Sequence, residues 1–229
     1  RYASRGLGDV YKRQDIVVLG RIHTEKDVES LRNNEIRYIH DICDNKWPML
    51  EKLWSNTNEH ALAITTTCYR LKELIESKVN KQVFVIPDPT EREEEPIIFK
   101  PNPHRLNAVY YGSYGNLKQI DWGIYDLSKV NLKIISNEGP IFWDFKIQGE
   151  FVRQSDLVLL PVNNDHDMTQ YKGNNRPIDA LRQGRFVITN AMIPSWQLLQ
   201  NFIWCGDINE GIKYAINNPD EVIKKVEEG

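Results

Sequence analysis

Apolar runs of strand length alternate with helix-favouring stretches through the first third of the chain. The apolar runs cover residues 15–20, 36–42, 61–67 and 83–86. Between them, helix-favouring sequence follows Thr24, then covers residues 48–54 and 68–78, and Asp27 placed three residues after Thr24 predicts a capping box. This alternation predicts a parallel sheet of the doubly wound type over residues 15–86.

A change in composition interrupts this pattern after residue 86. Residues 87–105 contain five prolines and four glutamates, the latter between positions 91 and 95. Neither a helix nor a central strand persists through such a stretch, because proline lacks the N–H group that both structures use. We interpret residues 87–105 as a linker between a partial N-terminal domain, 15–86, and a C-terminal domain, 106–229.

The alternation resumes in the C-terminal domain. The predicted strands are 107–111, 132–135, 156–161, 186–189 and 202–204. A helix closes at 151–154, a short helix covers 196–199, Asp207 caps a helix that runs to Asn218, and Pro219 starts the last helix. Both domains are therefore predicted to be α/β.

One stretch of the C-terminal domain, residues 172–190, combines a polar loop with the start of a helix. Pro177 suits the first turn of a helix, Gly184 supplies a stop, and 186–189 is the strand that follows. Lys172, Asn175 and Arg176 stand just ahead of the helix, where free N–H groups and a partial positive charge favour a diphosphate. The same residues are also compatible with ordinary helix punctuation on a solvated surface.

Three further groups of polar or small residues suit ligand contacts. Asp179, one step inside the helix at 177, can accept hydrogen bonds from a ribose diol. The turn after strand 107–111 contains Gly112 and Gly115, whose lack of side chains lets backbone N–H groups approach a ligand, although a plain turn has the same sequence. Asp41 and Asp44 lie near the carboxyl end of a predicted strand, where open α/β sheets place ligands.

Charge and cysteine content exclude several classes of protein. The chain carries 29 basic and 32 acidic residues, a net charge of −3, so it offers no basic stripe for nucleic acid. Cys43, Cys68 and Cys205 are widely spaced, which indicates neither a disulfide framework nor a zinc site. No apolar run approaches the roughly 20 residues that span a bilayer. We expect a soluble cytoplasmic protein.

The first 14 residues differ in character from the rest. They follow neither apolar period, and residues 6–14 look like translated sequencing adapter, so we exclude 1–14 from the fold as a non-native tail. The last helix is still running at Gly229. We therefore expect a fragment of a longer protein, with an incomplete N-terminal domain.

The pattern K-x-x-N-R-P-I-D-A-L-x-x-G-R-F-V-I, residues 172–188, resembles the donor-site helix of GT-B glycosyltransferases of the family-4-like group, also described as the glycosyltransferase family 1 group. The amino-acid sequences of residues 41–45, 64–67 and 85–89 resemble the last part of the N-terminal domain of those glycosyltransferases. The resemblance implies two Rossmann-like doubly wound domains. It also implies transfer of a sugar from a nucleoside-diphosphate sugar to an acceptor hydroxyl of a glycan or small molecule, typically in cell-envelope polysaccharide synthesis and without a metal or other cofactor.

The resemblance also suggests roles for individual residues. Asp179 corresponds to the acidic residue that contacts the nucleotide ribose. The family has a second glutamate eight residues earlier, where this chain has Tyr171. This departure leaves Lys172 and Arg176 as the ligands that stabilise the leaving diphosphate. Further candidates for contacts to the donor are Gly112, Ser113, Asn116 and Asn175. The candidates for contacts to the acceptor are Asp41 and Asp44.

Two alternatives remain open at the level of the sequence. Asp165 and Asp167 form a D-x-D after a strand, the arrangement with which GT-A glycosyltransferases hold a divalent metal on the diphosphate. A two-lobed sugar-binding protein without catalysis would use some of the six tryptophans for stacking. The basic start of the helix near 177 favours a nucleotide-sugar enzyme over a free-sugar receptor, because a free sugar carries no phosphate.

Overall fold

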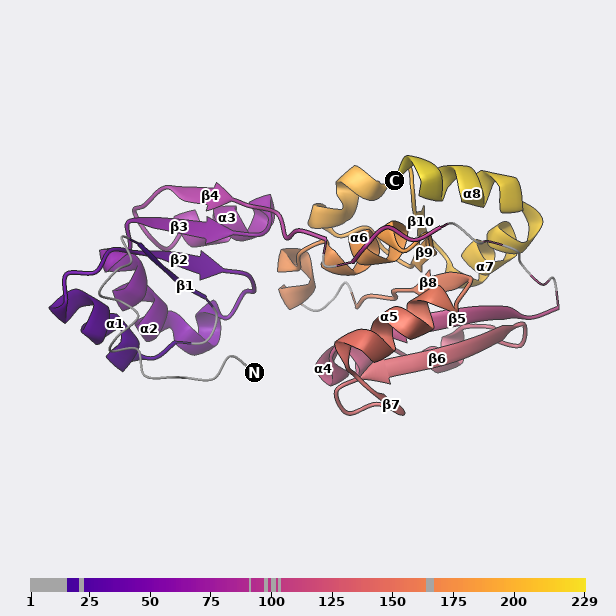
Figure 1. Ribbon diagram of the computed structural model, residues 1–229, viewed down its shortest axis with the longest axis horizontal. Helices are drawn as coiled ribbons and strands as arrows, with labels where there is room; N and C mark the ends of the chain where they lie inside the picture. Colours follow the sequence, from indigo (N-terminus) through magenta and orange to yellow (C-terminus); the bar gives the residue numbers. More distant parts are fainter. Residues whose placement is uncertain are drawn as a thin grey trace. The chain divides into compact units, whose positions relative to one another are not determined.

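The computed structural model describes residues 16–20, 23–90, 92–96, 99, 102, 104–163 and 167–229. They divide into two compact units (Figure 1). Unit 1 contains the described residues up to Pro87 together with Tyr171–Gly173, and unit 2 contains those of Asp88–Gln170 and Asn174–Gly229. The adapter-like residues 1–14 lie outside the described residues. No helix among the described residues is long and apolar enough to cross a membrane.

Unit 1 is built on a four-stranded parallel sheet, which confirms the strand–helix alternation. Its strands stand in chain order, β1(Val17–Leu19), β2(Tyr38–Ile42), β3(Ala63–Thr66) and β4(Val83–Val85). Each strand lies within one of the predicted apolar runs. The connecting helices are α1(Glu25–Asn33), α2(Trp47–His60) and α3(Tyr69–Glu76).

The ends of α1 and α2 follow from local chemistry. The predicted capping box is present: the Thr24 Oγ1 accepts a hydrogen bond from the Asp27 backbone N–H at 3.3 Å, and the Asp27 carboxylate accepts one from the Thr24 N–H at 2.7 Å. Helix α2 extends six residues beyond the predicted end at Trp54 and is kinked at Leu50, where φ is −124° and ψ is 17°. The prediction of this helix was therefore correct in type and too short.

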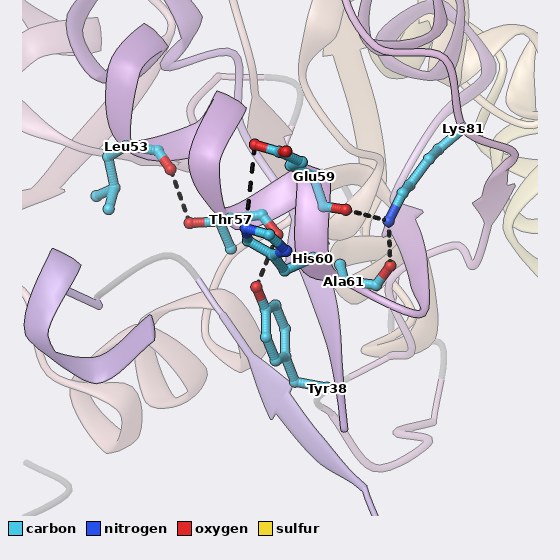
Figure 2. Close-up of polar contacts among 7 residues, drawn as sticks. All are labelled: Tyr38, Leu53, Thr57, Glu59, His60, Ala61 and Lys81. Atoms are coloured by element: carbon cyan, nitrogen blue, oxygen red, sulfur yellow. Dashed lines mark hydrogen bonds and ion pairs between the residues drawn. The ribbon is translucent and has the colours of Figure 1, made fainter. Parts of the chain in front are cut away.

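Polar contacts fix the end of α2 against the sheet (Figure 2). The Tyr38 hydroxyl, on β2, donates to the Thr57 carbonyl oxygen at 2.9 Å. The Lys81 ammonium donates to the carbonyl oxygens of Glu59, at 2.8 Å, and Ala61. The Thr57 carbonyl oxygen also accepts the Ala61 N–H at 3.1 Å, so the Tyr38 bond adds to a helical one. The Lys81 ammonium satisfies carbonyl groups at the end of the helix, and these bonds stabilise the turn from α2 into β3.

The three helices of unit 1 pack on the same face of its sheet. The buried apolar strand residues share one parity, and they join helix residues in the hydrophobic clusters of the unit. Residues of the opposite parity include Val18 and Phe84, which are 63% and 45% exposed. Successive right-handed crossovers in one direction place every connecting helix on one side of a sheet. The strand residues facing the helices are Val17, Leu19, Tyr38, Ile42, Ile64 and Val83.

Unit 2 is built on a six-stranded parallel sheet in the order β10-β9-β8-β5-β6-β7. The chain passes from β5 to β6 and β7 in one direction, and β8, β9 and β10 then continue from the other side of β5. This reversal is the topological switch point of a doubly wound sheet, and ligands bind such folds outside the carboxyl ends of the strands beside it. The strands are β5(Leu106–Tyr111), β6(Val130–Ser136), β7(Ile141–Phe142), β8(Leu157–Leu159), β9(Phe186–Thr189) and β10(Trp204–Cys205).

The helices predicted for unit 2 are all present, although some begin or end at other residues than predicted. The helix expected from Pro177 begins two residues earlier, the last strand covers Trp204–Cys205 in place of 202–204, and Asp207 caps its helix by accepting from the Glu210 N–H at 2.9 Å. Segments β7, α4, η2 and η3 were not predicted, because they are only two to five residues long. The helical segments are α4(Tyr114–Leu117), η2(Trp122–Ile124), α5(Phe145–Arg153), η3(Asp167–Tyr171), α6(Asn175–Arg182), η4(Pro194–Leu199), α7(Ile208–Asn217) and α8(Pro219–Glu228).

The described part of the proline-rich stretch lacks helix and strand and packs on unit 2. The Glu95 N–H donates to the Arg182 carbonyl oxygen at 3.0 Å, and the Arg92 guanidinium lies 3.6 Å from the centre of the Phe145 ring. Arg185, only 4% exposed, donates to the carbonyl oxygens of Val152, Arg153, Gly184 and Pro96 at 2.6–3.4 Å. This segment is therefore anchored to the core of unit 2.

Candidate functional site

The end of β5 turns directly into a short helix through Gly112 and Ser113. The Gly112 N–H still belongs to the sheet, since it donates to the Ile135 carbonyl oxygen at 3.2 Å. Ser113 then caps α4, and its hydroxyl accepts from the Asn116 N–H at 3.4 Å. Gly112, Ser113 and Asn116, three of the predicted donor-side residues, thus form one turn at the carboxyl end of the central strand.

Helix α6 begins at the same edge of the sheet, after the loop that follows β8. Its N-cap residue, Asn174, makes no side-chain cap hydrogen bond, and the Asn174 Oδ1 is buried without a hydrogen-bond partner among the described residues. The first backbone N–H groups of a helix have no partner within the helix. The start of α6, which includes Asn175 and Arg176, therefore keeps the positive end of the helix dipole without a capping side chain.

The β5 turn and the start of α6 are joined through Tyr111 and Arg176. The Tyr111 hydroxyl donates to the Arg176 carbonyl oxygen at 2.7 Å, and the Arg176 Nη1 donates to the Tyr111 carbonyl oxygen at 3.4 Å. Burial raises the pKa of Tyr111, and the nearby Asp179 carboxylate raises it further. The hydroxyl therefore remains a proton donor at every physiological pH.

Gly112 lies where the side chains of Tyr110 and Arg176 converge. A Cβ atom at this position would lie 2.7 Å from the Tyr110 hydroxyl oxygen and 3.2 Å from the Arg176 Nη1. A Cβ at Gly115, in the same turn, would contact nothing within 4 Å. Only the first of the two glycines is therefore required by packing, and it brings the backbone close to the Arg176 guanidinium.

Asp179, the residue predicted to contact a ribose, is buried in unit 2. It is 5% exposed, and its carboxylate accepts a hydrogen bond from the Thr90 hydroxyl at 3.3 Å. Thr90 comes from the proline-rich stretch, 89 residues earlier in the chain. In this structure the segment around Thr90 therefore occupies one hydrogen-bonding position of the carboxylate.

Lys172 belongs to a different unit from the other predicted donor-side residues. It lies in the short segment Tyr171–Gly173, which is part of unit 1, whereas Asn175, Arg176 and Asp179 belong to unit 2. Tyr171, which stands where the glutamate of the resembling family would be, packs against the hydrophobic cluster of unit 1. Its carbonyl oxygen accepts a hydrogen bond from the Cys68 thiol at 3.8 Å.

The predicted acceptor-side residues lie at the end of β2 in unit 1. Asp41 is inside the strand, and its carboxylate accepts hydrogen bonds from the Thr65 hydroxyl at 2.7 Å and from the Cys43 thiol at 3.2 Å. Asp44 follows in the loop after the strand. Asp41 therefore links neighbouring strands, a contact that stabilises the sheet with or without a ligand.

The D-x-D motif of the alternative metal site lies only partly within the described residues. Asp165 lies outside the described residues, and Asp167 begins the short helix η3. Elsewhere, within the residues that the structure describes, no group of three or more histidine, cysteine, aspartate or glutamate side chains could hold a metal ion.

Sequence reasoning missed the tyrosines and the threonine that contact the site. Tyr110 and Tyr111 were predicted only as part of a strand, and Thr90 only as part of a linker. The position of Tyr110 and Tyr111 directly before Gly112 is the one local feature of the sequence that could have pointed to these two tyrosines. For Thr90 no local signal exists, because its partner Asp179 is distant in the chain.

Comparisons with known proteins support the fold. No protein-family model and no curated protein matches the chain. A solved structure from Listeria monocytogenes, assigned as UDP-N-acetylglucosamine 2-epimerase, is 14% identical with a TM-score of 0.53, over 95% of this chain and 70% of that chain. The glycosylation associate protein (Gap123) complex of Streptococcus agalactiae is 10% identical with a TM-score of 0.53, over 93% of this chain and 50% of that chain. The chain therefore has an α/β fold with two Rossmann-like parallel sheets of the GT-B type, as predicted.

Proposed function

We propose that the chain binds a nucleoside-diphosphate sugar in unit 2 and transfers the sugar to an acceptor hydroxyl, as a step of cell-envelope or polysaccharide synthesis. One observation carries the proposal: the Gly112 turn, the Arg176 guanidinium and the uncapped start of α6 meet at the switch point of a doubly wound sheet. Backbone N–H groups, a helix N-terminus and a guanidinium are the groups that bind a diphosphate.

The same groups suit the chemistry of transfer. Departure of the nucleoside diphosphate places negative charge on the leaving phosphate while the anomeric carbon becomes oxocarbenium-like. Preorganised positive groups stabilise that charge, and removing one such group commonly costs a few kcal/mol of barrier. We assign this role to Arg176 and the start of α6, with Lys172 as a further candidate, and we assign no role to a metal.

Contacts to the rest of the substrate follow from the remaining residues. We assign the ribose to Asp179, whose hydrogen bond from Thr90 would be exchanged for one from the ribose diol. We assign the diphosphate backbone contacts to Gly112, Ser113, Asn116 and Asn175. Asp41 and Asp44 are the candidates for the acceptor, a glycan or a small molecule. The site of action on this proposal is the cytoplasm, where nucleotide sugars are made.

A second reaction on the same class of substrate is epimerisation of the sugar. It is favoured by the similarity in fold to the Listeria monocytogenes protein assigned as UDP-N-acetylglucosamine 2-epimerase. Incubation with UDP-N-acetylglucosamine separates the two reactions, because epimerisation yields a second UDP-sugar and transfer or hydrolysis releases UDP. A two-lobed sugar receptor would do neither.

Binding measurements test the shared part of the proposal. Thermal shift and calorimetry with UDP, GDP and free sugars should show stabilisation by a nucleotide. Arg176→Gln should weaken nucleotide binding by about tenfold or more, because it removes a charge-assisted hydrogen bond. Arg182→Gln is the matched control, since Arg182 lies in the last turn of the same helix and pairs with Glu94 at 3.0 Å. Stabilisation by a free sugar with no response to any nucleotide would favour the receptor.

A further inference from the structure

The hydroxyl of Tyr110 is a buried polar group that the proposed function does not yet use. Tyr110 has no exposed surface, and its hydroxyl oxygen has no hydrogen bond of standard geometry among the described residues. A buried hydroxyl without a well-formed hydrogen bond costs up to about 1–3 kcal/mol, so such a group in a folded protein calls for an explanation.

The ring of Tyr110 is held in place by aromatic packing. It stacks edge-on against Trp122 at a centroid distance of 5.4 Å, and Trp122 in turn packs against Tyr125 at 6.0 Å. The hydroxyl is thereby directed to Gly112, where a Cβ atom would lie 2.7 Å from it.

The Arg176 guanidinium lies beside this hydroxyl. Its Nη1 is 3.2 Å from the same Cβ point at Gly112, and its positive charge and its hydrogen bonding to the hydroxyl both oppose the rise that burial imposes on the pKa of Tyr110. Tyr110 and Tyr111 are consecutive on β5, so their side chains leave opposite faces of the sheet. Arg176 therefore meets the Tyr110 side chain through its guanidinium and the Tyr111 side chain through its carbonyl group.

We propose that Tyr110 is a positioning residue for the anion site. The hydrogen bond that its hydroxyl accepts from the Arg176 guanidinium reaches standard geometry when an anion binds, and this bond holds the remaining N–H groups of the guanidinium toward a phosphate oxygen. The inference rests on the proposed function, since it assigns Arg176 to the diphosphate. It differs from that proposal in assigning Tyr110 no contact with the ligand itself.

A double-mutant cycle tests the inference with UDP and inorganic pyrophosphate as probes. Tyr110→Phe should weaken the binding of both anions by about five- to tenfold, the effect expected for the loss of one intramolecular hydrogen bond. In the Arg176→Gln background, Tyr110→Phe should have no further effect, because the guanidinium that it positions is gone. Tyr125→Phe is the matched control: it removes a hydroxyl from the same aromatic cluster and should leave both affinities unchanged.

A spectroscopic measurement separates positioning from a merely structural role. The Nε–H resonance of Arg176, assigned by its loss in Arg176→Lys, should shift on addition of pyrophosphate in the parent and in Tyr125→Phe, and should shift much less in Tyr110→Phe. Equal affinities and equal shifts in Tyr110→Phe and the parent would overturn the positioning role while leaving the proposed function intact. A parent protein that binds neither UDP nor pyrophosphate would overturn both.

Discussion

Tyr111 and Arg176 are joined by two hydrogen bonds that run in opposite directions, from the tyrosine hydroxyl to the arginine carbonyl and from the guanidinium to the tyrosine carbonyl. The pair fixes the start of α6 to the end of the central strand of unit 2. Because both residues are held, the guanidinium beside Gly112 has a defined place before any ligand arrives. Such preorganisation lowers the cost of binding, since fewer side-chain rotamers are lost at that moment.

Substitution of Tyr111 should therefore affect stability and binding together. Tyr111→Phe removes the 2.7 Å bond from a residue that is 3% exposed, and we expect a loss of about 1 kcal/mol in the free energy of unfolding. Urea denaturation measures this loss, and calorimetry with UDP measures the weaker binding. Tyr69→Phe, at a tyrosine that is 74% exposed, is the control and should change neither quantity. Unchanged stability in Tyr111→Phe would contradict the importance of the pair.

The two glycines of the β5 turn should respond differently to the same substitution. Gly112→Ala places a methyl group 2.7 Å from the Tyr110 hydroxyl oxygen, so the tyrosine or the arginine must move. We expect a loss of about 1–3 kcal/mol, typical of overpacking, together with weaker nucleotide binding. Gly115→Ala should be neutral in both measurements, because the added methyl group meets nothing within 4 Å. Equal behaviour of the two variants would show that the Gly112 packing is unimportant.

Arg185 should be a major source of stability in unit 2. It donates to four carbonyl oxygens, one of which belongs to Pro96 in the proline-rich stretch. Arg185→Met removes the guanidinium donor from these carbonyl groups, although the Val152 carbonyl keeps its bonds from Ser155. We expect a loss of about 3 kcal/mol in chemical denaturation. Limited proteolysis should then cut within 88–96 sooner than in the parent. Arg105→Met, at an exposed arginine before β5, should have no such effect.

His40 should make unit 1 sensitive to acid. It has no exposed surface, its Nδ1 lies 2.6 Å from the Asn58 Oδ1, and burial lowers its pKa from 6.5 to about 4. The charged neighbours act in opposite directions, as His23 lowers the pKa and Asp41 raises it. The unfolded chain therefore binds a proton between pH 6.5 and 4 that the folded chain does not bind, so stability falls as the pH falls through this window.

The size of this effect can be measured by comparison with a variant. Between pH 7 and pH 5 we expect His40 to contribute a loss of about 2 kcal/mol to the free energy of unfolding. Urea denaturation at both pH values, for the parent and for His40→Gln, isolates the contribution of this residue from that of the carboxylates. Parallel pH dependence in the two proteins would contradict it.

Chelation distinguishes the two ways of binding a diphosphate. If Arg176 and the start of α6 neutralise the phosphates, EDTA should leave UDP binding unchanged, and Mn²⁺ should not increase it. If the D-x-D of Asp165 and Asp167 holds a metal, Mn²⁺ should increase UDP binding and Asp165→Asn should abolish the increase. Calorimetry with UDP in both conditions gives the answer directly.

Much of the local structure of this protein follows from the sequence alone. The strand–helix alternation, the capping box at Thr24 and the cap at Asp207 depend on residues within a few positions of one another, and the structure confirms each of them. The spacing of apolar residues and the capping of helices by side chains involve residues within one or two turns of each other. Both can therefore be recognised in the sequence without knowledge of the fold. The order of the strands in a sheet depends on contacts that are distant in the chain. The alternation of strands with helices predicted only that the strands run parallel.

Only the tertiary structure decided how the site is assembled. Arg176 meets Tyr111 across 65 residues of sequence and Asp179 meets Thr90 across 89, and no local pattern reports either contact. Lys172, four residues before Arg176, was grouped with it by spacing, yet it belongs to the other unit. The reversal of strand order beside β5 is what brings the Gly112 turn and α6 to one edge of the sheet. The physical reason is that packing and strand pairing choose partners by their position in space, whereas a sequence pattern records only separation along the chain.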